Sequence, residues 1–281
     1  MAQLAQTVAD EWRAALPAWA AAEQIVLLEA VEEVLTRAVC RWAGVPLHED
    51  EVAERTHELR EMVAAAGSVG PRNLLAQWLR RQDEQWAEEQ IKRIRARKLD
   101  APVESAAYAI ALHREPDGEL LDTGIAAVEL INLLRPTVAV GRFIMFAALA
   151  LHEHPECRTR LAAGDEQYLQ WFVQEVRRFY PFFPAIGGRV LEEFEWRGHH
   201  FEQGDWVLLD MYGTNHDPRS WEQPDVFNPE RFRTQGVTPY NLIPQGGGDY
   251  ADTHRCPGEP ATVAIMQTAV RLLVSAMAYN V

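Results

Sequence analysis

Residues 245–266, QGGGDYADTHRCPGEPATVAIM, place one cysteine between a glycine run and a segment with helical character. Cys256 directly follows the basic pair His254 and Arg255. A helix N-terminus and nearby positive charge favour the thiolate form of a cysteine. Glycines just before the cysteine let the backbone approach something flat and bulky. Cys256 is therefore a candidate nucleophile or metal ligand.

Other interpretations of this stretch stay open at this point. A lone cysteine is more often a small buried residue than a functional one. Zinc is poorly supported, because His254 and Cys256 are too close together to share one ion easily and no second ligand pair follows. A phosphate loop would need a Gly-Lys-Ser/Thr ending, which the glycine run lacks. A nucleophile would need a histidine partner, and sequence cannot place any candidate beside the cysteine: His152, His154, His199, His200 or His216.

Composition narrows the class of protein. The chain has 281 residues, of which 48% are apolar, so a sizeable core can form. Its formal net charge of -14 argues against nucleic-acid binding, which needs clustered basic residues. The 3 cysteines show no pair spacing, which suits a reducing compartment. The N-terminus lacks signal-peptide features, and the longest clean apolar run, FIMFAALAL, is too short to span a bilayer. We expect a cytoplasmic protein without a membrane span.

Hydrophobic periodicity predicts a chain that is mainly α with a small β part. Residues 1–112 have the pattern of successive amphipathic helices. Residues 123–155 are nearly apolar all round, which predicts a central buried helix. The period then changes at 189–213, where β character and turn signals at Arg197-Gly198 and Gln203-Gly204 predict strands. A last helix is expected from residue 259 onward.

A second set of residues shares the C-terminal half with Cys256. Glu175 and Arg178 have Glu-x-x-Arg spacing, and FNPERF, with Arg231, follows about fifty residues later. This ordered set resembles the C-terminal half of a cytochrome P-450. The resemblance implies that Cys256 is the axial thiolate ligand of haem b iron. It also implies a buried structural cluster of Glu175, Arg178 and Arg231, and haem-binding roles for His254, which would face a propionate, and Gln245.

The motifs also resemble one branch of that family, the fatty-acid peroxygenases. The family's central helix usually carries an acid followed by Thr, but here Arg135 and Pro136 occupy that place, and IPQGGGDY and HRCPGE follow. The resemblance implies use of hydrogen peroxide to hydroxylate the α or β carbon of long-chain fatty acids. Arg135 would hold the substrate carboxylate, and Pro136 would bend the helix. By periodicity alone, pairing of Arg135 with a protein carboxylate such as Glu129 is favoured.

The same resemblance leaves further expectations. Phe183 and Ile186 would line the substrate tunnel, and no redox partner would be required. Residues 1–281 would form a single haem-thiolate domain with an incomplete cytochrome P-450 fold, truncated at both ends. Three alternatives remain open: oxidative decarboxylation to terminal alkenes, a reductase-dependent monooxygenase, and a non-catalytic haem-protein fragment.

Overall fold

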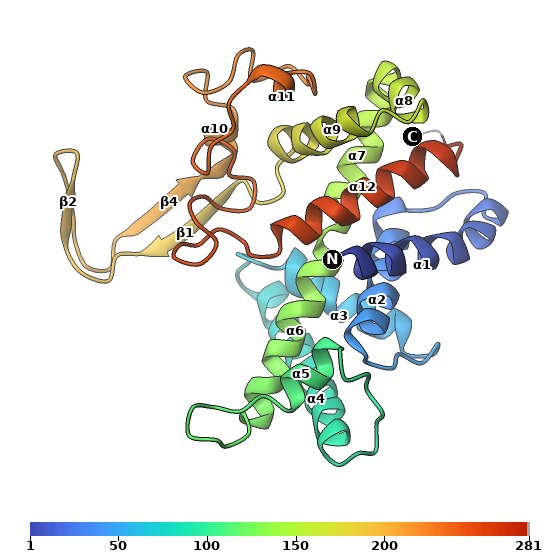
Figure 1. The fold of residues 1–281 in the computed structure, drawn as a ribbon. Helices are drawn as coiled ribbons and strands as arrows, with labels where there is room; N and C mark the ends of the chain where they lie inside the picture. The colour runs from blue at the N-terminus through green and yellow to red at the C-terminus, as the bar shows by residue number, and fades with distance from the viewer. Residues whose placement is uncertain (280–281) are drawn as a thin grey trace. The chain divides into compact units, whose positions relative to one another are not determined.

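A computed structural model describes residues 1–279 and is mostly helical, with short strands (Figure 1). The expected fold class, mainly α with a small β part, is confirmed. The strands are β1 (Ala185–Arg189), β2 (Phe194–Trp196), β3 (His199–Phe201) and β4 (Trp206–Asp210). The helices are α1 (Ala2–Ala21), α2 (Leu27–Ala43), α3 (Val52–Ala64), α4 (Pro71–Arg95), α5 (Ala106–Ala111), α6 (Thr123–Ala139), α7 (Gly141–Glu153), α8 (Pro155–Ala162), α9 (Glu166–Phe179), α10 (Met211–Asn215), α11 (Arg231–Thr234) and α12 (Glu259–Ser275).

The described residues divide into two compact units. The first combines Met1–Met145 with Pro260–Met277, and the second combines Phe146–Glu259 with Ala278 and Tyr279. The single haem-thiolate domain expected from the sequence stays a prediction. Arg135 belongs to the first unit and Cys256 to the second.

In the first unit, helix ends follow local sequence signals. Helix α2 ends where Gly44 adopts the left-handed conformation, with φ of 80°. A Cβ at this position would lie 2.5 Å from Ser105 Oγ, so glycine is required by space as well as by φ. Helix α6 begins at Thr123 because the Asp122 carboxylate accepts hydrogen bonds from the amides of Gly124 and Ile125.

The long apolar segment predicted at 123–155 forms α6 and α7, which are interrupted at Val140, four residues after Pro136. Leu130, Leu134 and Val138 of α6 are buried, as expected for a core helix. By length and composition alone, Thr123–Glu153 could cross a membrane, but 56% of its most apolar window is buried inside the protein. That burial fits the central helix that the sequence predicts.

In the second unit, α9 is capped by Asp165, whose carboxylate accepts from the Tyr168 amide, and ends two residues before Pro181. Strands β1 and β4 pair antiparallel, and β2 and β3 form a hairpin at the end of that ribbon (Figure 1). The hairpin turns at Arg197 and Gly198, which both have positive φ, as the sequence predicts. This ribbon follows α9 directly and leads through α10 into the loops that carry the functional residues.

Candidate functional site

The loop before α12 folds back on itself around Cys256. The Cys256 amide donates to the backbone carbonyl of Gln245 over 2.9 Å, and the Cys256 carbonyl accepts from the Glu259 amide at 3.2 Å. Gly246 and Gly248 both lie in the left-handed region, with φ of 90° and 89°. A Cβ on Gly246 would lie 2.6 Å from the carbonyl oxygen of His254. The glycine run is therefore needed so that two backbone segments can approach each other beside the cysteine.

The thiol of Cys256 is available to a ligand. Cys256 is a free cysteine of intermediate exposure, whereas Cys40 and Cys157 are buried. A Cβ on Gly258 would lie in contact with Cys256 Sγ, at 3.6 Å, so the glycine leaves this side of the sulfur uncovered. No hydrogen bond to Sγ is found within residues 1–279. An accessible sulfur beside closely packed glycine backbone fits a thiolate ligand for a flat group such as haem.

The described residues do not favour the other chemistries considered for Cys256. Within residues 1–279, no cluster of three or more His, Cys, Asp or Glu side chains could hold a metal ion. None of the histidines hydrogen-bonds the thiol in that part of the chain. His216, one of the candidate bases, instead contacts the Tyr212 carbonyl through Nδ1 at 3.0 Å. Burial lowers the pKa of His216 below its usual range.

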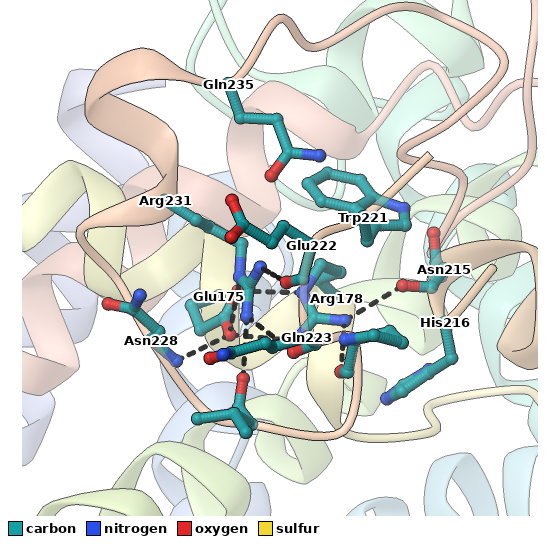
Figure 2. A network of polar contacts seen from close by, with 12 residues as sticks. Glu175, Arg178, Asn215, His216, Trp221, Glu222, Gln223, Asn228, Arg231 and Gln235 are labelled. Atoms are coloured by element: carbon teal, nitrogen blue, oxygen red, sulfur yellow. Dashed lines mark hydrogen bonds and ion pairs between the residues drawn. The ribbon is translucent and has the colours of Figure 1, made fainter. Parts of the chain in front are cut away.

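Glu175, Arg178 and Arg231 come together in the second unit (Figure 2). Arg178 donates through Nε and Nη2 to the two carboxylate oxygens of Glu175, both at 2.8 Å. Arg231 Nε reaches the same carboxylate at 3.1 Å. Glu175 and Arg178 are fully buried, and Arg231 is nearly so. Charges buried this deeply are tolerated only when they neutralise and bond one another.

The remaining donors of the two arginines bind backbone carbonyls of the loops that follow the sheet (Figure 2). Arg178 Nη1 donates to the carbonyls of Asn215 and Pro224, both at 2.9 Å. Arg231 donates to the carbonyls of Glu222, Gln223 and Val226. These contacts fix the end of α10 and the irregular segment after it, whose own backbone hydrogen bonds form only short turns, so the cluster serves structure.

Arg177, the neighbour of Arg178 in the chain, forms a second charged network that was not predicted from the sequence. Arg177 is buried and donates to Glu259 at 2.5 Å and to the Gln245 side chain at 3.0 Å. Glu259 also accepts from Arg255 at 2.7 Å and from Tyr250 at 3.1 Å. One sequence signal was available: Arg177 follows Val173 by one helical turn and so lies on the buried face of α9.

Arg135 is half-buried on α6 in the first unit. Its guanidinium forms a long hydrogen bond to Asn132 Oδ1, at 3.4 Å, and no ion pair within the described residues 1–279. Burial lowers the pKa of Arg135, the charge of Arg80 lowers it further, and Asp83 opposes both effects. Glu129, the partner favoured by periodicity, is exposed and is not bonded to Arg135. Arg135 is therefore a half-buried positive charge that an anionic ligand would stabilise.

The other expected site residues lie in the second unit. His254 is exposed in the Cys256 loop, and Gln245 is half-buried at its start. Phe183 contacts Phe182 edge to face, with ring centroids 4.6 Å apart, in the segment between α9 and β1. Ile186 lies on β1 opposite Leu209 of β4 and is exposed. Pro136 lies inside α6, in the other unit, directly after Arg135.

Comparison with known proteins supports the reading of these motifs. Residues 163–276 match the family model for cytochrome P450. Curated relatives include rhazimal synthase of Alstonia scholaris, 29% identical over 52% of this chain and 34% of that protein. Ferruginol synthase of Salvia fruticosa is 36% identical over 38% of this chain and 22% of that protein. The chain therefore spans at most about a third of the length of these curated relatives.

Solved structures match nearly the whole chain. Cytochrome P450SP alpha (CYP152B1), in complex with (R)-ibuprophen, is 49% identical with a TM-score of 0.92, and the match covers 99% of this chain and 68% of that one. Cytochrome P450EX alpha (CYP152N1), with myristic acid, is 42% identical with a TM-score of 0.88, covering 96% and 65%. A variant of cytochrome P450 OleT, in complex with arachidonic acid, is 32% identical with a TM-score of 0.88, covering 96% and 65%. By this likeness in sequence and fold, the chain belongs to the cytochrome P450 superfamily and, within it, to the CYP152 family.

Proposed function

We propose that this protein is a haem-thiolate peroxygenase that uses hydrogen peroxide to hydroxylate long-chain fatty acids at the α or β carbon. The observation that carries the proposal is Arg135, a half-buried cation on an apolar helix with no ion-pair partner in residues 1–279. A long-chain carboxylic acid would supply the missing negative charge, and its apolar chain suits the buried helix around Arg135.

Cys256 is the residue proposed to hold haem b. When bound, the haem would supply the oxidising chemistry, and its thiolate ligand would favour cleavage of the peroxide O–O bond. Of the chain's own groups, Cys256 Sγ would donate to iron because it is unbonded and partly exposed. His254, exposed in the same loop, and Gln245 would contact the polar edge of the haem.

Arg135 is proposed to bind the substrate carboxylate and to orient it. Guanidinium presents several donors in one plane, which matches the two oxygens of a carboxylate. The bound carboxylate would itself carry protons, in place of the acid and alcohol that the family usually has on this helix. Positioned proton transfer of this kind typically contributes about 10²–10⁴-fold in rate. Anchoring the acid end also determines that the α or β carbon, rather than the chain terminus, is oxidised.

Related structures support the substrate class. Cytochrome P450EX alpha was solved with myristic acid, and an OleT variant with arachidonic acid. Both are linear carboxylic acids with long apolar chains, the chemistry that an unpaired Arg135 on an apolar helix would accept. Phe183 and Ile186 are proposed to contact the hydrocarbon chain, and the protein is proposed to act in the cytoplasm without a redox partner.

The test is turnover of a long-chain fatty acid by the haem-loaded protein with hydrogen peroxide and no electron donor. Hydroxylated acid is the expected product. A terminal alkene would indicate decarboxylation instead, and a strict need for NADPH and a ferredoxin would overturn the peroxygenase assignment. Lack of turnover under both conditions, in protein that retains haem, would favour a non-catalytic haem protein.

A further inference from the structure

Gln245 and Glu259 lie at the two ends of the loop that contains Cys256, and the buried side chain of Arg177 binds the side chains of both. Arg177 Nη2 donates to Gln245 Oε1 at 3.0 Å and to Glu259 Oε1 at 2.5 Å. Arg177 comes from α9, far earlier in the chain, and its side chain is fully buried. A buried guanidinium therefore connects the start and the end of the loop.

The far side of Glu259 is bonded as well. Its Oε2 accepts from Arg255 Nε at 2.7 Å and from the Tyr250 hydroxyl at 3.1 Å. The Arg255 guanidinium also lies over the Tyr250 ring, 4.5 Å from its centroid. Burial would raise the pKa of Glu259, but the bond from Arg255 and the charge of Arg177 outweigh it, so the pKa is lowered and the carboxylate stays charged.

The backbones of these same two residues hold Cys256. The Gln245 carbonyl accepts from the Cys256 amide at 2.9 Å, and the Glu259 amide donates to the Cys256 carbonyl at 3.2 Å. Each residue thus binds Arg177 through its side chain and Cys256 through its main chain. A shift of either side chain would move a hydrogen-bond partner of the cysteine.

We propose that Arg177 is a positioning residue for the Cys256 sulfur, with Glu259 as its counter-charge. The inference rests on the proposed function, in which this sulfur is the haem ligand. It assigns the two adjacent arginines of α9 different tasks. Arg178 holds the loops at Asn215 and Pro224, whereas Arg177 holds the loop that presents the thiolate.

The geometry requires an arginine at this position. Arg177 Nη2 serves Gln245 and Glu259 while Nη1 donates to Gln174 Oε1 at 2.5 Å, so the planar group spans three acceptors. Lysine carries the same charge at a single nitrogen and cannot reproduce this arrangement. A charge-conserving change should therefore loosen the loop, although it leaves the buried charge balance unaltered.

The test compares two variants with a matched control. Glu259→Gln removes the counter-charge with little change of shape, and Arg177→Lys keeps the charge but loses the planar donors. Glu230→Gln is the control, because it breaks an ion pair with Arg160 in the same unit through the same chemical change. Two readouts are taken on purified protein: amide hydrogen exchange across residues 246–258, and the long-wavelength Soret band that the reduced carbon monoxide complex shows only with a thiolate ligand.

Both variants should exchange amides in the loop at least about tenfold faster than the parent, the size expected when a charge-assisted hydrogen bond is lost. They should also show a larger share of the short-wavelength band of protein that has lost its thiolate ligand, while the Glu230→Gln protein matches the parent. Parent-like exchange and spectra in both variants would overturn the positioning role. If Arg177→Lys does not fold, Glu259→Gln alone decides. A parent protein that binds haem without the long-wavelength band would refute the proposed function instead. The exchange data would then still show whether Arg177 and Glu259 restrain the loop.

Discussion

Arg177 and Arg178 are adjacent in α9 and both fully buried, yet their guanidinium groups pair with different acids. Arg178 binds Glu175, one turn earlier in the same helix, and Arg177 binds Glu259, at the start of α12. Because successive side chains on a helix point about 100° apart, neighbouring residues can serve two separate loops. One helix face thus stabilises the segment after the sheet, and the next positions the cysteine loop.

Replacing Cys256 tests the proposed haem ligand. Serine binds iron far more weakly than a thiolate, so Cys256→Ser should lose the long-wavelength band of the carbon monoxide complex and all peroxide-driven turnover. The measurement is the difference spectrum of the reduced protein. Cys157→Ser is the control, because that buried thiol accepts a hydrogen bond from Tyr168 and donates to the neighbouring Glu156, so its replacement should leave the spectrum unchanged.

Replacing Arg135 tests substrate anchoring. Arg135→Ala should raise the KM for a long-chain fatty acid by roughly 10- to 150-fold, the equivalent of a charge-assisted hydrogen bond worth about 1.5–3 kcal/mol. Haem content should not change. The exposed Arg81, on α4 in the same unit, provides the control variant Arg81→Ala. Unchanged kinetics in Arg135→Ala would remove this residue from the mechanism.

Glu175→Gln tests the buried cluster. The amide keeps the shape but leaves Arg178 and Arg231 without their shared counter-charge, which should reduce the free energy of unfolding by about 3–5 kcal/mol. Urea denaturation followed by circular dichroism measures the difference. The matched variant Glu193→Gln makes the same change at an exposed carboxylate of the same unit and should behave as the parent. Parent-like stability of Glu175→Gln would show that the cluster is not needed for folding.

A buried acid pair in the first unit predicts an unusual pH dependence. Asp83 and Glu58 lie beside Arg55, and burial raises the pKa of each to about 7. An acid whose pKa is raised on folding binds more protons in the folded state than in the unfolded one. Its contribution is therefore greatest below its ordinary pKa near 4 and falls as pH rises toward 7.

The free energy of unfolding should therefore decrease between pH 5 and pH 8, and Asp83→Asn should weaken this slope and stabilise the protein at pH 8. Part of the slope should remain, because burial also raises the pKa of Glu32 to about 7. Thermal unfolding at several pH values measures both effects. An Asp83→Asn variant with the parent's pH profile would contradict the raised pKa of this carboxyl group.

The sequence predicted the long helices and the β part, and its resemblance to a cytochrome P-450 indicated the cluster of Glu175, Arg178 and Arg231. The apolar periodicity of 123–155 and the capping residues at helix ends can be recognised in the sequence, because these signals depend only on neighbours along the chain. The spacing of Glu175 and Arg178 follows from one helical turn, so their contact could be anticipated. The cysteine loop was found because glycine, cysteine and a following helix form a local pattern.

Only the tertiary structure decided which acid each arginine meets. Periodicity favoured Glu129 as the partner of Arg135, but that side chain is exposed and Arg135 stays without an ion pair within residues 1–279. Arg177 and Glu259 are 82 residues apart, and no local pattern relates them. Ion pairs across such distances depend on how helices and loops pack, and burial then sets which charges must be matched.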